Sequence, residues 1–216
     1  MKKIKKDVNK NGQIWVETVI YTLIGLILIG VILAFATPAI QKYKDKSTIT
    51  ASINSMNALD NNILDVKRGG IANVRNIDFL ISKGKLLIDS EKDQITFEIT
   101  GSKYAYSEPG DKISLTGSDL EIITKEQSGK YDVILTLDYL KNNKANITFE
   151  GKDSIEIREF NPGAVPYNFI IENRGKLPTS TICSPDADPT GCEEKQDCSA
   201  SGVCFPKATN IDISEL

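Results

Sequence analysis

The 216-residue sequence contains no histidine, and this absence removes many common catalytic arrangements. Without an imidazole there is no Ser-His-Asp or Cys-His pair, no histidine general base and no histidine-ligated zinc. The sequence also lacks a phosphate-binding glycine loop, a G-x-S-x-G turn and an H-E-x-x-H motif. Acidic residues are scattered, and their spacing marks no catalytic pair. We therefore expect neither enzymatic activity nor a cofactor.

Charged residues are also missing from Thr18 to Ile40. The core of this run, Thr18 to Ala36, is almost wholly apolar. At about 1.5 Å per residue, a helix over this core is roughly 28 Å long, close to the hydrocarbon thickness of a bilayer. The run therefore predicts a helix that spans a membrane.

Residues 1–12 precede this run and carry five lysines and one aspartate, a net charge of +4. By the positive-inside rule, the N-terminus is expected in the cytoplasm and the rest of the chain outside. Without residues 1–12, the 26 basic and 29 acidic residues fall to 21 and 28, a net charge of −7. This acidic balance argues against nucleic-acid binding through a general basic surface and favours a soluble extracellular domain.

Glu17 is an acidic residue one turn inside the expected start of the apolar helix. A carboxylate at membrane depth is costly unless it is paired, and such residues usually face a partner. Glu17 is therefore expected to need a partner.

The lysine-rich leader, Gly12, Gln13, Glu17 and the apolar run together resemble the class III signal peptide of type IV prepilins. Gln directly after Gly is similar to the archaeal form of this motif. The resemblance implies that a membrane-embedded aspartic prepilin peptidase cuts between Gly12 and Gln13 on the cytoplasmic side. It also implies that Glu17 pairs with the Gln13 amine of a neighbouring subunit. The chain would then assemble with copies of itself or other pilins into a cell-surface filament for adhesion.

This resemblance covers residues 1 to about 40 and does not separate a major pilin from a minor pilin or a pseudopilin. A lysine-rich flank before an apolar helix is equally typical of an uncleaved signal anchor. The chain would then be a monomeric membrane-anchored extracellular binding module. A cleaved secretory peptide is the third interpretation, with Ala34-Phe35-Ala36 as a weak A-x-A site. The apolar region of a secretory signal peptide is normally shorter than this run, about 7–15 residues.

After Pro38 the sequence becomes polar but keeps a helical period. Apolar residues recur at intervals of three or four, as on one face of an amphipathic helix: Ile49, Ile53, Met56, Leu59, Ile63 and Val66. Gly69-Gly70 supplies a stop signal. We predict one helix from about Gln13 to Arg68, with residues 13–40 as the membrane and assembly segment and 41–68 as its amphipathic continuation.

From Asn73 onward the apolar period changes to two, as in Ile95, Phe97 and Ile99, and turn residues separate such runs. Nine strands are expected: 74–81, 84–89, 94–100, 112–116, 119–125, 130–140, 145–150, 153–160 and 166–173. The predicted fold class is α+β, in which the long helix packs on an antiparallel β-sandwich-like ectodomain at residues 69–174.

Residues 175–216 form a Cys-rich C-terminal segment that is poor in apolar runs. It holds all four cysteines of the chain: Cys183, Cys192, Cys198 and Cys204. Because no C-x-x-C pair is present and the expected compartment is oxidising, two disulfides are favoured over a zinc site. Three pairings stay open. The last residues are expected to fray.

Two further sites are candidates outside the helix. Oxygen-bearing residues occupy positions 1, 3, 5, 9 and 12 of a calcium-loop-like stretch around Gly191: Asp186, Asp188, Thr190, Glu194 and Asp197. Pro189 inside this stretch and the Asp at its twelfth position favour a solvated acidic turn without metal. Asn146-Ile147-Thr148 is an N-glycosylation sequon in the expected extracellular part.

Overall fold

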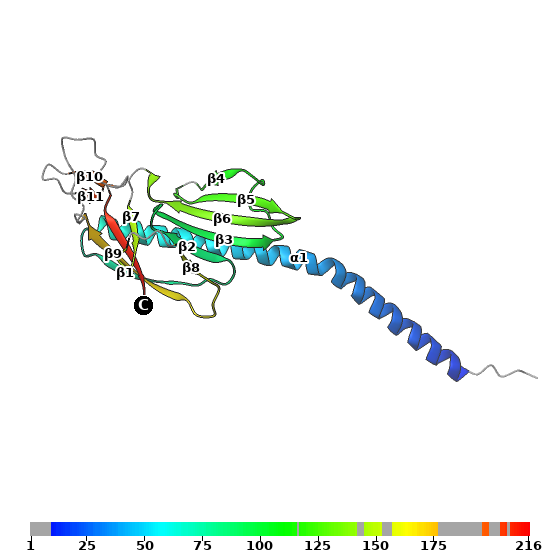
Figure 1. Ribbon diagram of the computed structural model, residues 1–216. Coiled ribbons are helices and arrows are strands. Elements are labelled where there is room, and N and C mark those ends of the chain that lie inside the picture. Colours follow the sequence, from blue (N-terminus) through cyan, green and yellow to red (C-terminus); the bar gives the residue numbers. More distant parts are fainter. Residues whose placement is uncertain are drawn as a thin grey trace, which may run out of the picture. The chain divides into compact units, whose positions relative to one another are not determined.

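The computed structural model describes these parts of the chain: residues 10–115, 117–141, 145–152, 157–176, 196–198, 204–206 and 208–216. For residues 10–14, 196–198 and 204–206 it describes the backbone alone. The chain divides into two compact units, Met1–Lys44 and Asp45–Leu216. Helix α1 (Lys10–Arg68) contributes its first part to one unit and its second part to the other. All strands belong to the second unit (Figure 1).

The predicted long helix is confirmed, and it begins at Lys10, three residues before the expected start. Its predicted apolar stripe, from Ile49 to Val66, is buried throughout, with no member more than 5% exposed. Gaps of three and four keep these side chains on one face, so a single side of α1 can pack against the sheets.

The helix ends where the sequence predicts. Lys67 and Arg68 occupy its last turn, where positive charge is favourable to the helix dipole. The Gly69 amide donates to the Asp65 carbonyl at 2.9 Å, and Gly70 then adopts a φ of 84°. Glycine reaches this left-handed conformation without a Cβ clash, so the chain can leave the helix here.

All nine predicted strands are present, with shifted ends. They are β1 (Val74–Phe79), β2 (Lys85–Asp89), β3 (Gln94–Ser102), β4 (Lys112–Ser114), β5 (Glu121–Gln127), β6 (Lys130–Asp138), β7 (Asn146–Phe149), β8 (Arg158–Phe160) and β9 (Tyr167–Gly175). Three further strands are β10 (Gln196–Cys198), β11 (Cys204–Pro206) and β12 (Asn210–Glu215). The sheets have the orders β4-β5-β6-β3-β2-β8, β1-β9-β12-β7 and β10-β11.

The expectation that the last residues fray is wrong for β12. This strand lies between β9, to which it is antiparallel, and β7, to which it is parallel. Ile211 and Ile213 are at most 1% exposed. A six-residue strand with two buried isoleucines gains its stability from strands that lie far away in the sequence. The residues next to β12 in the chain therefore do not predict it.

The helix and the two large sheets share one hydrophobic core. Aromatic rings connect the sheets: the Phe79 ring of β1 lies 6.1 Å from the Phe97 ring of β3. Phe160 of β8 lies 5.0 Å from Phe169 of β9, edge to face. Such pairs add about 0.5–1.5 kcal/mol each beyond the area they bury. The α+β class is thereby confirmed, with α1 packed on sheets that are mostly antiparallel.

The buried position of β12 can be tested by truncating one side chain. Ile213→Ala removes a fully buried side chain and should lower the free energy of unfolding of the second unit by about 2–5 kcal/mol. Leu216→Ala is the control, because Leu216 is 77% exposed and its loss should change stability by less than about 0.5 kcal/mol. Urea unfolding of the full chain in detergent measures both, and equal small effects would contradict a buried β12.

Candidate assembly site on the N-terminal helix

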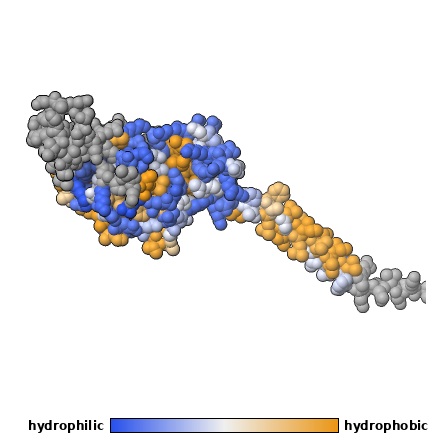
Figure 2. All heavy atoms as spheres, viewed as in Figure 1, coloured by the Kyte–Doolittle hydropathy of each residue, from blue (hydrophilic) through white to orange (hydrophobic). Residues whose placement is uncertain are grey.

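The first unit presents an almost continuous apolar surface (Figure 2). Fifteen large apolar side chains between Trp15 and Phe35 are each at least 45% exposed. Burying one such side chain is worth about 1.5–3 kcal/mol, so this surface requires lipid or other apolar helices around it. Among the described residues, α1 is the one helix long and apolar enough to cross a membrane, which is compatible with membrane anchoring.

Glu17 lies exposed on this helix. The Tyr21 hydroxyl, one turn later, donates to Glu17 Oε1 at 3.3 Å, a long hydrogen bond. No described cation forms an ion pair with the carboxylate. Because an ionised carboxylate can accept about four hydrogen bonds, Glu17 keeps most of its capacity for a partner outside its own chain.

The residues of the expected cleavage site, Gly12 and Gln13, lie in the first turns of α1. Their backbone is described, and their side chains are not. Gln13 precedes Glu17 by four residues, so the two positions lie on the same face of the helix, about one turn apart. Cleavage at Gly12 and the assembly role of Gln13 and Glu17 stay predictions.

Other polar groups of the apolar segment are satisfied within the helix. The Thr22 hydroxyl donates to the Thr18 carbonyl at 3.0 Å, and the Thr37 hydroxyl donates to the Leu33 carbonyl at 2.7 Å. Such bonds to the preceding turn are usual for hydroxyl side chains in apolar helices. Glu17 therefore differs from these residues, since among the described side chains of the helix only the long bond from Tyr21 reaches its charge.

Asn146, the sequon asparagine, lies in β7 and is 6% exposed. Its Nδ2 donates to Asn210 Oδ1 at 3.0 Å, and the hydroxyl of the sequon residue Thr148 donates to Asp212 Oδ1 at 2.7 Å. A glycan on Nδ2 would have to replace the bond to Asn210 and bring this nitrogen to the surface. Glycosylation stays a prediction.

The cysteine and calcium candidates fall largely outside the described residues. Cys198 and Cys204 are partly described: their backbones lie opposite each other in the β10–β11 pair. Nothing is described of these positions: Cys183, Cys192, Asp186, Asp188, Thr190 and Glu194. The side chain of Asp197 is likewise not described. Disulfides and calcium both stay predictions.

A set of buried acids in the second unit was not predicted from the sequence. Asp45 is 2% exposed and accepts hydrogen bonds from Lys83 Nζ and the Lys103 amide, both at 2.8 Å. The signal for Asp45 was its spacing, because it precedes Ile49 by four residues and so continues the buried face of α1. Sequence spacing could not identify its partners.

Two further buried acids have partners in the strands or directly after a strand. Asp60 accepts a hydrogen bond from the Tyr139 hydroxyl at 2.9 Å. Burial and the neighbouring charge of Asp60 raise the pKa of Tyr139 well above its ordinary value, so the hydroxyl stays a neutral donor. Asp212 of β12, 1% exposed, accepts from Thr148 and pairs with Arg174 Nη2 at 2.7 Å. These contacts connect α1 to the region after β6 and connect β12 to both of its neighbours.

Comparison of the chain with models of protein families, with curated proteins and with solved structures gives no match. Its function must be inferred from its own residues.

The contribution of the Glu121 carboxylate to the stability of the second unit should depend on pH. Hydrogen bonds from Lys112 and from Lys141, the latter at 2.7 Å, lower the pKa of Glu121. The stabilisation is present above the ordinary carboxyl pKa and is lost as the pH falls through the lowered value. Since both lysines are more than half exposed, Glu121→Gln should cost at most about 1 kcal/mol at neutral pH.

Stability curves of wild type and Glu121→Gln, measured against pH, should converge in acid. Glu91→Gln is the control, because Glu91 is exposed and no ion pair of Glu91 is found among the described residues. A difference between wild type and Glu121→Gln that stays constant down to strongly acidic pH would contradict the role of the two lysines.

Proposed function

We propose that this chain is a type IV pilin-like structural subunit. A prepilin peptidase cleaves between Gly12 and Gln13 on the cytoplasmic side, and residues 13–40 hold the mature chain in the membrane. The chain then assembles through this helix, with copies of itself or with other pilins, into a cell-surface filament or a minor pilin complex that serves surface attachment. The acidic second unit lies outside the cell.

The observation that carries the proposal is the charge of Glu17 on an apolar helix, where it accepts one long hydrogen bond from Tyr21 and forms no ion pair with a described residue. Helices surrounded by lipid gain no hydrophobic drive for association, so packing and polar contacts decide which helices pair. Cleavage after Gly12 creates a cationic amine on Gln13, which gives each subunit one acid and one base near the same end of its helix. The amine of one subunit and Glu17 of its neighbour can then form a charge pair.

Close approach of helices is supported by two glycines of the apolar segment. Apart from the neighbouring backbone of α1 itself, no described atom lies within 4 Å of the position that a Cβ would occupy at Gly25 or Gly30. Small residues let helix backbones approach closely, which strengthens packing in an apolar environment. These positions are available for contact with a second helix.

The first test is the N-terminal residue of the protein purified from membranes. The proposal expects a mature chain that begins at Gln13. Replacing Gly12 by a bulky residue should block the cleavage and leave the longer chain in the membrane. An intact Met1 in the wild type, or a start after Ala36, would refute prepilin processing and favour a signal anchor or a secretory peptide.

The second test is Glu17→Gln, which removes the charge while keeping the shape of the side chain. Loss of one partner of an ion pair in an apolar setting costs about 3–5 kcal/mol. Because about 1.4 kcal/mol corresponds to a factor of ten, incorporation into filaments should fall more than a hundredfold. The measurement is the filament fraction sheared from cells, with Gly12 cleavage checked in parallel.

Thr22→Val is the matched control for Glu17→Gln. It also removes a polar group from the apolar helix, but that hydroxyl is already bonded to carbonyls of its own helix. Filament yield should therefore stay near wild type in Thr22→Val. Equal yields from wild type and Glu17→Gln would contradict the pairing role and favour the monomeric membrane-anchored module.

A further inference from the structure

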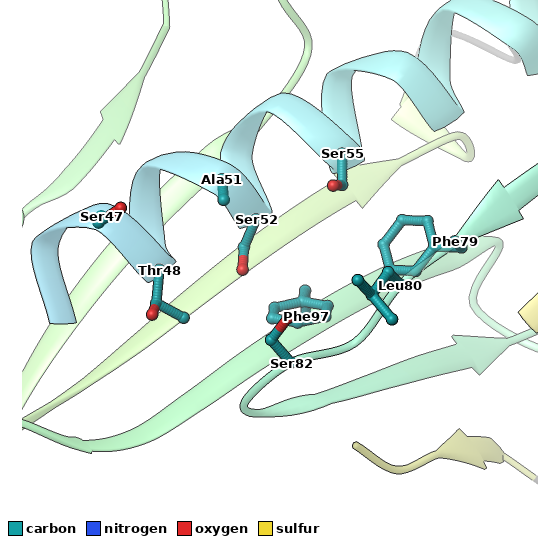
Figure 3. A pocket seen from close by; sticks show the side chains of 9 residues that line it. All are labelled: Ser47, Thr48, Ala51, Ser52, Ser55, Phe79, Leu80, Ser82 and Phe97. Atoms are coloured by element: carbon teal, nitrogen blue, oxygen red, sulfur yellow. The ribbon is translucent and has the colours of Figure 1, made fainter. Parts of the chain in front are cut away.

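The second unit holds two features that neither its core nor its buried acids explain: a cavity beside α1 and the β10–β11 hairpin. The cavity has a volume of about 240 Å³ and is lined by Ser47, Thr48, Ala51, Ser52, Ser55, Phe79, Leu80, Ser82 and Phe97. Figure 3 shows Ser52 and Ser55 on the helix side, facing the side that holds Leu80, Ser82 and Phe97. None of these lining residues is charged, so the cavity selects no class of ligand. The hairpin, by contrast, sets two residues of defined chemistry opposite each other.

The β10–β11 hairpin brings two of the four cysteines together in its backbone. The two strands pair antiparallel and form a sheet of their own (Figure 1). Their register sets Gln196 opposite Pro206, Asp197 opposite Phe205 and Cys198 opposite Cys204. Directly opposed residues lie on the same face of a hairpin, so Cys198 and Cys204 share one face.

Pro206 identifies the kind of pair that the two cysteines form. In an antiparallel ladder, hydrogen-bonded and non-hydrogen-bonded pairs alternate. Because Pro206 has no amide hydrogen, Gln196 and Pro206 cannot exchange both backbone hydrogen bonds and form a non-hydrogen-bonded pair. Cys198 and Cys204 are two positions further along and form a pair of the same kind. The Cα atoms of such a pair lie about 4.5 Å apart, within the range of about 4.4–6.8 Å that a disulfide requires.

The separation of the cysteines in the sequence does not select this pair. Cys192 and Cys198 are separated by the same number of residues as Cys198 and Cys204. A flexible chain would therefore close either loop at the same entropic cost. Pairing of β10 with β11 has already brought the ends of the second loop together, so the register favours a bond between Cys198 and Cys204.

We propose that Cys198 and Cys204 form a disulfide across the β10–β11 hairpin. With this pair joined, Cys183 and Cys192, which lie outside the described residues, are left as the second pair. In each bond the two thiols lose two protons and two electrons, and the oxidant is another disulfide, which is reduced to two thiols. One cysteine thiolate attacks the oxidant and displaces its first thiol, and the other cysteine thiolate then displaces the second. This pairing goes beyond filament assembly and does not depend on it.

The bond stabilises a hairpin that is weak without it. An isolated two-stranded sheet is marginally stable in water, and a cross-link between its strands restricts the unfolded chain. Strand β12, which follows the hairpin, is instead paired on both sides, with β7 and with β9. Reduction of the disulfide should therefore loosen β10 and β11 and leave β12 in place.

A tryptic digest of the full chain, purified in neutral detergent, tests the pairing. The chain is reduced, oxidised with a mixture of oxidised and reduced glutathione, and alkylated at its remaining thiols. Trypsin cuts after Lys176, Lys195 and Lys207, which separates the first two cysteines from the last two. We expect two separate peptides, 177–195 and 196–207, each lighter by two hydrogens than its reduced form. Either of the other two pairings joins these peptides, so a joined mass would overturn the proposal, as would four alkylated thiols.

Cys198→Ser should leave Cys204 as a free thiol and leave peptide 177–195 oxidised. Cys192→Ser is the matched control, which should free Cys183 and leave peptide 196–207 oxidised. Under either of the other pairings, Cys198→Ser would instead free a cysteine of peptide 177–195, which would contradict the proposal. If Cys198→Ser fails to fold, the digest of the wild type decides.

Hydrogen exchange of the oxidised and the reduced wild type gives a second readout. Reduction should speed exchange of residues 196–198 and 204–206 more than about tenfold, and it should leave β12 unchanged. Equal exchange of the hairpin in both states would overturn the stabilising role of the bond. Because oxidation is carried out in vitro and no readout depends on filaments or on Gly12 cleavage, failure of this pairing is distinguishable from failure of the proposed pilin function.

Discussion

One continuous helix has to satisfy two different environments, and the rest of the protein depends on how it does so. From Thr18 to Ile40 its side chains are uncharged and mostly apolar on all sides, so this part needs lipid or other helices around it. From Ile49 to Val66 one apolar face is buried in the core of the second unit. Both large sheets share that core, so a helix whose first part is long and apolar enough to cross a membrane also completes the folded domain.

Polar contacts to β9 and to the segments that connect the strands hold this second part of α1 at defined positions. Asp45 binds Lys83 and the Lys103 amide near the start of the second unit, and Asp60 binds Tyr139 further along. At the end of the helix, Asn173 Nδ2 donates to the carbonyls of Val66 and Lys67, both at 3.2 Å. An apolar stripe alone tolerates sliding by one turn, whereas a displaced buried acid would lose its donors. These contacts therefore specify how the helix sits on the sheets.

Three buried acids of the second unit contrast with Glu17 on the apolar helix. Asp45, Asp60 and Asp212 are buried in the second unit, and each is matched with donors from the same chain. Glu17 lies on the apolar helix with one long hydrogen bond from Tyr21 among the described residues. The chain thus supplies partners for these three buried charges, whereas no ion pair of Glu17 is found among the described residues. This contrast supports the proposal that Glu17 acts in assembly, since anchoring requires no charge there.

The sequence by itself determined the elements whose signal is local. The stripe from Ile49 to Val66 and the Gly69-Gly70 stop predicted α1, and alternation predicted nine strands, because helical and extended periods are visible within a few neighbouring residues. The candidate assembly residues Gly12, Gln13 and Glu17 came from the resemblance of residues 1 to about 40 to a class III signal peptide, which is also a local pattern. Tertiary structure alone decided the strand order, the central position of β12 and the cavity that Ser52 and Ser82 both line. These features arise from contacts between residues that are distant in the chain. Such contacts produce no periodic pattern in the sequence.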